Sequence, residues 1–206
     1  TPVVASEMEF HLLEIDRDQF GRPQHTQRAL DGSPALGGAT YGIEAMRKIA
    51  PLMDAISSTA GQQNLPVDTL ISEFGASQCE INLHYQDCAL RACDQASMLR
   101  RAIRAVAHQQ GKQASFMAKP FADDVGNGMH IHFSLIDNNR NNVFDNGTPE
   151  GSDLLHHAVA GCLDNMADSM AIFAPNINSY RRLVPGCYAP TAPTWGYENR
   201  TTALRI

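Results

Sequence analysis

Carboxylates and histidines recur in this sequence as pairs two residues apart. Glu7 and Glu9 form one pair in a segment that mixes apolar and charged residues, and His130 and His132 form another beside a glycine-rich turn. In a β-strand, side chains two apart face the same side, so each pair would present its groups together. Two ionised carboxylates facing an interior are costly without a cation, whereas on a solvated face they need none. The spacing therefore predicts either a cation site or a plain solvent-facing strand.

Two further carboxylates lie on either side of a predicted tight turn at residues 75–78. Glu73 and Glu80 both have apolar sequence neighbours, as buried strands do. A hairpin would bring them to one end of a sheet, either as ligands or as exposed strand ends. With the first two pairs they would form a ligand set of mostly oxygen atoms, which suits Mg²⁺ or Mn²⁺ better than Zn²⁺.

Arginines gather near the end of the chain, at Arg181, Arg182, Arg200 and Arg205. The guanidinium group grips carboxylates and phosphates in a bidentate manner. Cations and arginines together are the usual equipment for phosphoryl transfer, in which catalysis is largely positioning and charge neutralisation. The sequence lacks the Gly-x4-Gly-Lys-Ser/Thr pattern, so a P-loop is excluded.

The elements that must position these residues alternate between strands and helices. Hydrophobic periodicity predicts helices over residues 41–61, 89–110 and 153–173, and strands over residues 3–15, 69–74, 80–85, 114–117 and 129–136. Residues 16–40 and 137–151 are predicted loops, and residues 181–206 end in a strand-like tail. This order predicts an α+β fold with an antiparallel or mixed sheet backed by helices.

Composition excludes several classes of function. The 206 residues carry 16 Lys and Arg against 22 Asp and Glu, a net charge of −6, so neither nucleic acid nor an anionic membrane is expected as the partner. The longest apolar run falls short of the roughly 18 residues that span a bilayer, and the first ten residues lack a positively charged leader. Five scattered cysteines favour free thiols in a reducing compartment, so we expect a cytoplasmic protein.

Five segments, in order along the chain, resemble characteristic blocks of the glutamine synthetase superfamily catalytic domain. Ser77 stands where that family usually has glycine, and the block with His130 and His132 resembles its ATP-region signature. The resemblance covers essentially the whole chain and implies a curved antiparallel or mixed sheet backed by helices. The five segments are residues 7–10, 73–80, 126–132, 178–186 and 199–206.

The resemblance implies a metal site with two or three Mg²⁺ or Mn²⁺ ions. Glu9, Glu73 and Glu80 would bind one ion near the acceptor substrate. Glu7 and His130 would bind a second ion, which holds the phosphates of ATP. The family completes this second site with a glutamate that would lie beyond the last residue.

The resemblance also implies a nucleotide site. His132 and Ser134 would contact ATP, and Tyr85 stands where the family has an aromatic residue near the nucleotide. Arg200 and Arg205 would neutralise phosphate charge during transfer, with Arg200 as a catalytic residue.

The implied reaction joins glutamate to an amine. ATP would phosphorylate the γ-carboxylate of glutamate, and an amine would then displace phosphate. Gly126 would contact the glutamate through its backbone, and Arg182, the second catalytic residue, would bind the α-carboxylate.

Where glutamine synthetases have a glutamate that binds ammonium, this chain has Tyr188, a neutral phenol. The chain thus resembles the glutamate–amine ligases, such as γ-glutamylpolyamine synthetases. Glutamine synthetase itself and a non-catalytic homologue that binds ATP or an amine remain the alternatives.

The domain organisation follows from the same resemblance. The family adds an N-terminal β-grasp domain and a further C-terminal part of the catalytic domain, so we expect residues 1–206 to form a single partial catalytic domain with little or no activity by itself. The family forms hexameric rings, often stacked as dodecamers, so a homo-oligomer is expected for the full-length protein.

Overall fold

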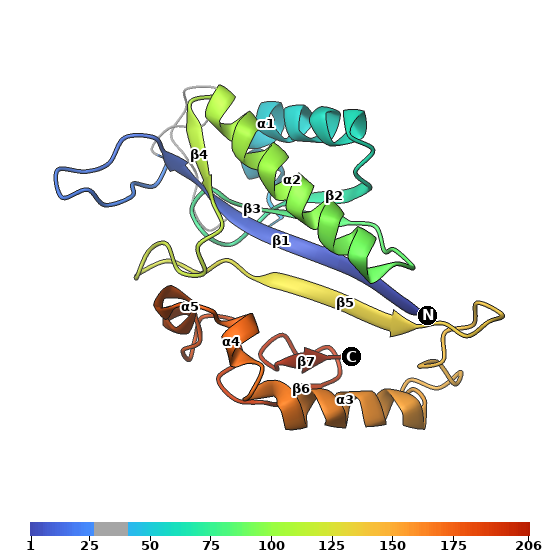
Figure 1. The fold of residues 1–206 in the computed structure, drawn as a ribbon. Helices are drawn as coiled ribbons and strands as arrows, with labels where there is room; N and C mark the ends of the chain where they lie inside the picture. Colours follow the sequence, from blue (N-terminus) through green and yellow to red (C-terminus); the bar gives the residue numbers. More distant parts are fainter. Residues whose placement is uncertain (27–40) are drawn as a thin grey trace. The chain divides into compact units, whose positions relative to one another are not determined.

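The computed structural model describes residues 1–26 and 41–206, which divide into two compact units (Figure 1). One unit comprises Val4–His132, and the other comprises Thr1–Val3 with Phe133–Ile206. The predicted loop over residues 16–40 lies in large part outside the described residues.

The first unit is built on a sheet in the order β2-β3-β1-β4, with β5 also paired to β1. Within it β1 pairs antiparallel with β3 and β4, and β2 pairs antiparallel with β3. The prediction of an α+β fold with an antiparallel sheet is therefore confirmed. The strands are β1 (Pro2–Glu14), β2 (Val67–Ser72), β3 (Gln78–Leu83), β4 (Lys112–Ser115) and β5 (Met129–Leu135).

Two long helices, α1 (Ile43–Gln62) and α2 (Ala89–Gln109), pack against this sheet (Figure 1). Phe10 of β1, Ile81 of β3 and Leu99 of α2 are fully buried in the shared core. Burying one such side chain stabilises the fold by roughly 1.5 to 3 kcal/mol. Because side chains alternate along a strand, the residues between these core positions point to the opposite face. The packing on the helices therefore directs Glu7, Glu9 and Glu80 to the face away from the core.

The hairpin between β2 and β3 differs from its prediction by two residues. Both strands begin and end two positions early, so Glu73 lies in the turn and not on a strand. Gln78 N–H donates to the Gly75 carbonyl (3.1 Å), and Glu73 N–H donates to the Gln78 carbonyl (2.9 Å), which closes the turn. Ser77 has a φ of +58°, a left-handed conformation that favours glycine. The sequence predicted this turn but not its bounds, because Phe74 and Cys79 extend the apolar pattern of the strands into it.

The second unit contains α3 (Asp153–Met166), α4 (Met170–Phe173), α5 (Ile177–Arg182), β6 (Trp195–Gly196) and β7 (Leu204–Arg205). The prediction of one helix over residues 153–173 is wrong. Ser169 N–H is shared between the carbonyls of Asn165 (3.0 Å) and Met166 (3.1 Å), and the helix breaks there. Ser152 caps the start of α3, because its hydroxyl accepts the Leu155 N–H.

Two features at the end of the chain also differ from the sequence prediction. The strand-like tail is only the two-residue β7, which pairs parallel with β6. Helix α5 was not predicted, although Asn176 caps it by accepting the Ser179 N–H (3.1 Å). An asparagine before a polar helix start is the signal that could have found it.

Strand β4 also begins and ends two residues earlier than the sequence predicts. Helix α1 runs through Pro51 without ending there, and the five cysteines are free. No helix in residues 1–26 and 41–206 is both long enough and apolar enough to cross a bilayer.

Candidate metal centre

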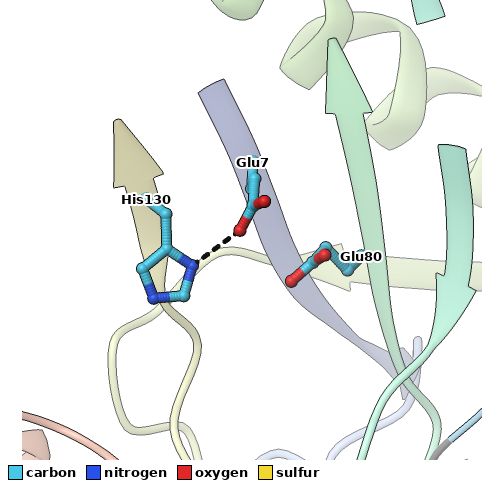
Figure 2. A group of neighbouring side chains, drawn as sticks. All are labelled: Glu7, Glu80 and His130. Atoms are coloured by element: carbon cyan, nitrogen blue, oxygen red, sulfur yellow. Dashed lines mark hydrogen bonds and ion pairs between the residues drawn. The ribbon is translucent and has the colours of Figure 1, made fainter. Parts of the chain in front are cut away.

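Three neighbouring strands bring two carboxylates and an imidazole together on the sheet face opposite the helices. Glu7 comes from β1, Glu80 from β3 and His130 from β5 (Figure 2). Each offers a ligand atom within 4.8 Å of those of the other two. The central position of β1, paired with both β3 and β5, is what joins residues separated by up to 123 positions in sequence.

Both oxygens of the Glu7 carboxylate are engaged by histidines. His130 Nδ1 lies 2.9 Å from Oε2, and His132 Nε2 lies 2.7 Å from Oε1. An ionised carboxylate can only accept hydrogen bonds, so each of these nitrogens carries the hydrogen and donates the bond. The two imidazoles hold the pKa of Glu7 well below its usual range, and Glu7 raises the pKa of His130. A cation bound by Glu7 and His130 would have to replace the proton on His130 Nδ1.

Glu80 is a carboxylate that its surroundings disfavour as an anion. Only 7 % of the residue is exposed, and it pairs with Glu9 across β1 and β3. Burial, followed by the charges of Glu7, Glu9 and Glu73, raises the pKa of Glu80 to about 7. Such gathered negative charge would be relieved by a bound cation.

Glu9 and Glu73, the remaining predicted ligands, are held differently. Glu9 Oε2 accepts hydrogen bonds from Gln78 Nε2 and from the Gly128 N–H, both at 2.8 Å. Glu73 Oε2 lies 3.3 Å from the Phe74 N–H in the turn. The resemblance implies that Glu80 shares a metal with Glu9 and Glu73, but in the structure Glu80 lies beside Glu7 and His130. It also pairs with Glu9 across the strands.

The donors of this cluster fit a hard divalent cation. Carboxylate oxygens with one imidazole are the ligands that Mg²⁺ and Mn²⁺ accept, and cysteine is absent from the group. Asn82 pairs with Glu7 across the strands, and its side-chain oxygen is buried without a hydrogen-bond partner. A water molecule on a cation could donate to that oxygen. Sequence reasoning missed Asn82, although its spacing of two from Glu80 places it on the same face.

The other predicted contacts in the first unit lie near the ends of these strands. Tyr85 follows β3 and is 70 % exposed. Gly126 precedes β5, and its carbonyl accepts from Gln78 Nε2 at 3.0 Å. Gln78 was read from the sequence as part of a turn, but it is the first residue of β3 and contacts both Glu9 and Gly126.

The remaining predicted residues belong to the second unit. Ser134 lies in β5, Arg182 ends α5, Arg205 lies in β7, and Arg200 precedes β7. This unit also has a cavity of about 440 Å³ with a neutral lining. Its lining residues are Pro185, Gly186, Tyr188, Ala189, Thr191, Ala192, Thr194 and Thr201.

Comparison with known proteins identifies the class to which this fold and cluster belong. The profile of the family "Glutamine synthetase, catalytic domain" matches residues 1–206, so the chain belongs to the glutamine synthetase family. It is 42% identical over 205 residues to gamma-glutamylputrescine synthetase PuuA of Escherichia coli, covering 100% of this chain and 43% of that protein. It is 32% identical over 207 residues to the glutamine synthetase of Thermotoga maritima, covering 100% of this chain and 45% of the relative.

Solved structures agree with this assignment. A GmaS–ADP complex superposes with a TM-score of 0.81 at 27% identity, covering 99% of this chain and 47% of the other. The chain thus spans less than half the length of the relatives that it matches.

Proposed function

We propose that the full-length protein joins the γ-carboxylate of glutamate to an amine through a γ-glutamyl phosphate, in the manner of a γ-glutamylpolyamine synthetase, at the expense of ATP. The observation that carries the proposal is the convergence of Glu7, Glu80 and His130 on one sheet face, in a chain of the glutamine synthetase family. Phosphoryl transfer to a carboxylate brings anions together, and this cluster supplies the ligands for cations that would offset their repulsion.

In this proposal the carboxylates and His130 act as ligands that hold cations beside the phosphates of ATP. Glu9, Glu73 and Glu80 hold one cation, and Glu7 with His130 holds another. These Mg²⁺ or Mn²⁺ ions would neutralise and orient the phosphates of ATP. The repulsion from neighbouring carboxylates that helps to raise the pKa of Glu80 would also be offset by a bound cation, which would displace the proton.

The remaining roles concern ATP and glutamate. Tyr85, His132 and Ser134 would contact the nucleotide. Gly126 would orient glutamate. The arginines would bind its α-carboxylate and offset phosphate charge, Arg182 in the first role and Arg200 and Arg205 in the second.

We propose that the acceptor is an organic amine and not ammonia. Tyr188 lies in the neutral lining of the 440 Å³ cavity, which has no carboxylate to attract a small ammonium ion. Apolar and hydroxyl-bearing walls suit the methylene chain of a larger amine. The similarity to gamma-glutamylputrescine synthetase supports the same choice.

Ammonia is the second candidate acceptor, because all of this chain also matches a glutamine synthetase at 32% identity. For either acceptor we expect the full-length protein to work in the cytoplasm as a homo-oligomer, with hexameric rings stacked in pairs. The active sites would be completed by parts of the protein outside these 206 residues.

The test is phosphate release by the purified full-length protein with ATP, Mg²⁺ and glutamate. Putrescine, spermidine, ethanolamine and ammonium are compared at equal concentrations, and we expect putrescine or spermidine to give the fastest release. The Tyr188→Glu variant should shift the ratio of rates toward ammonium by about tenfold, which corresponds to roughly 1.4 kcal/mol. Tyr188→Phe keeps the ring without adding charge and should leave the ratio unchanged.

Two results would contradict the proposal. Release with ammonium alone would make the protein a glutamine synthetase. Nucleotide binding without release for any amine would make it a non-catalytic homologue.

A further inference from the structure

We infer that Gln78 is a positioning residue that orients the Glu9 carboxylate and couples it to the loop at residues 126–128. The inference rests on the proposed function, because Glu9 is there a metal ligand and Gly126 a glutamate contact. Gln78 is only 3 % exposed, so its amide must find its partners within the protein.

Both ends of the Gln78 amide are used. Nε2 donates to Glu9 Oε2 (2.8 Å) and to the Gly126 carbonyl (3.0 Å), and Oε1 accepts the Gly75 N–H (2.9 Å). A buried site that needs a donor on one side and an acceptor on the other is matched by an amide and not by a carboxylate. A glutamate here would turn a second negative charge toward Glu9.

The hydrogen bonds of Glu9 show how Gln78 fixes the orientation of the Glu9 carboxylate. Its Oε2 accepts from Gln78 Nε2 and from the Gly128 N–H, each at 2.8 Å. Neither bond uses Oε1, so the two bonds fix the rotation of the carboxylate without occupying that oxygen. Groups that orient a metal ligand in this way contribute about 10- to 100-fold in metal affinity.

The loop on the other side of Gln78 is itself firmly anchored. Asn127 is 7 % exposed, and its Nδ2 donates to the carbonyls of Ser115 (3.1 Å) and Met117 (2.8 Å). Its Oδ1 lies 2.8 Å from Nδ1 of the fully buried His11. Because Gln78 holds both this anchored loop and Glu9, displacing its amide should disturb metal binding and glutamate binding together.

The experiment is calorimetric titration of Mn²⁺ into the purified full-length protein, with the wild type, Gln78→Met, Glu9→Gln and the double variant. The quantity compared is the Kd of the sites that Glu9→Gln weakens. We expect Gln78→Met to raise this Kd by about 10- to 100-fold. In the Glu9→Gln background, Gln78→Met should raise it no further, because it acts through Glu9. The KM for glutamate should also rise in Gln78→Met.

A matched control makes the same change elsewhere. Gln62→Met alters an exposed glutamine of α1 and should leave Mn²⁺ affinity unchanged. If Gln78→Met does not fold, Gln78→Asn provides the second variant, since its shorter amide cannot span the same partners, and the same loss is expected.

The outcomes separate this inference from the proposed function. A wild type that binds no Mn²⁺, or a Glu9→Gln variant that binds it normally, would overturn the metal assignment and the inference together. Normal Mn²⁺ affinity in Gln78→Met, with Glu9→Gln impaired and only the melting temperature of Gln78→Met lowered, would overturn the inference alone, because Gln78 would then be merely structural.

Discussion

At the scale of single residues, the cluster on β1, β3 and β5 combines groups with opposite tendencies. Glu7 is kept ionised by two imidazoles, whereas burial and neighbouring charge favour the protonated form of Glu80. Both carboxylates lie within 4.8 Å of the same His130 ligand atom. The metal-free protein therefore contains protons that a cation would displace, and its metal affinity should increase with pH up to about 7.

The first residue-level prediction concerns stability without metal. Between pH 5 and 7 the unfolded chain has released the Glu80 proton, but the folded chain still holds it, because its folded pKa of about 7 exceeds the ordinary 4.5. The folded state binds more protons, so the contribution of Glu80 to the free energy of unfolding falls as pH rises through this window. Glu80→Gln abolishes that fall, and it should gain roughly 1 to 3 kcal/mol relative to wild type between pH 5 and 8.

Urea unfolding at pH 5, 6, 7 and 8 in EDTA measures this gain. Glu44→Gln, on an exposed part of α1, is the control for removing a carboxylate. Parallel pH profiles for Glu80→Gln and wild type would contradict the raised pKa.

At the scale of elements, the turn between β2 and β3 carries Glu73 and leads into Gln78 and Glu80. It packs so closely on β1 and the loop before β5 that a side chain is not tolerated at Gly75. A Cβ there would lie 2.7 Å from His11 Nε2, 2.8 Å from Val125 Cγ2 and 2.9 Å from Gln78 Oε1. The neighbouring Asp124 also joins the turn to this loop, since its carboxylate accepts the N–H of Ala76 (3.0 Å).

Gly75→Ala should accordingly destabilise the protein by about 1 to 3 kcal/mol, the usual cost of overpacking a tight site. It should also weaken Mn²⁺ binding, because Gln78 must shift. Gly61→Ala is the matched control, since nothing lies within 4 Å of a Cβ there and the site is helical, and we expect it to be neutral or slightly stabilising. Equal melting temperatures for the two variants in thermal unfolding would contradict this prediction, because the turn would then have room for a Cβ at residue 75.

At the scale of the whole molecule, the cluster of Glu7, Glu80 and His130 lies where β3, β1 and β5 are neighbours. A cation bound there would join three strands that the sheet already aligns, so metal binding should stabilise the folded state as a whole. The helices α1 and α2 pack on the opposite face and form the core that holds those strands in place.

Free Mn²⁺ at 100 times its Kd should therefore stabilise the full-length protein by about 2.7 kcal/mol per site, and EDTA should reverse the effect. Thermal unfolding with and without Mn²⁺ measures it. Glu7→Gln should remove the part of the shift in melting temperature that comes from the site of Glu7 and His130, whereas Asp54→Asn, exposed on α1, should keep the whole shift. A shift of the same size in Glu7→Gln would place the stabilising cation elsewhere.

The sequence by itself determined which residue types are available and which side of a strand they face. The spacing of two between Glu7 and Glu9 predicts that both carboxylates face the same side of a strand. The structure has that arrangement, with Met8 and Phe10 in the core on the other side. Alternation is a local property of an extended chain, so a short segment contains all of it.

Only the tertiary structure decided which of these residues meet. The position of β1 between β3 and β5 brings Glu7 to Glu80 and His130. The turn at residues 73–77 brings the Gln78 amide within hydrogen-bond distance of the Glu9 carboxylate. Strand order, register and the pKa of Glu80 depend on contacts between segments far apart in the chain. Local hydrophobic patterns contain no information about those contacts, and this is why Gln78 and the break after α3 were found only in the folded molecule.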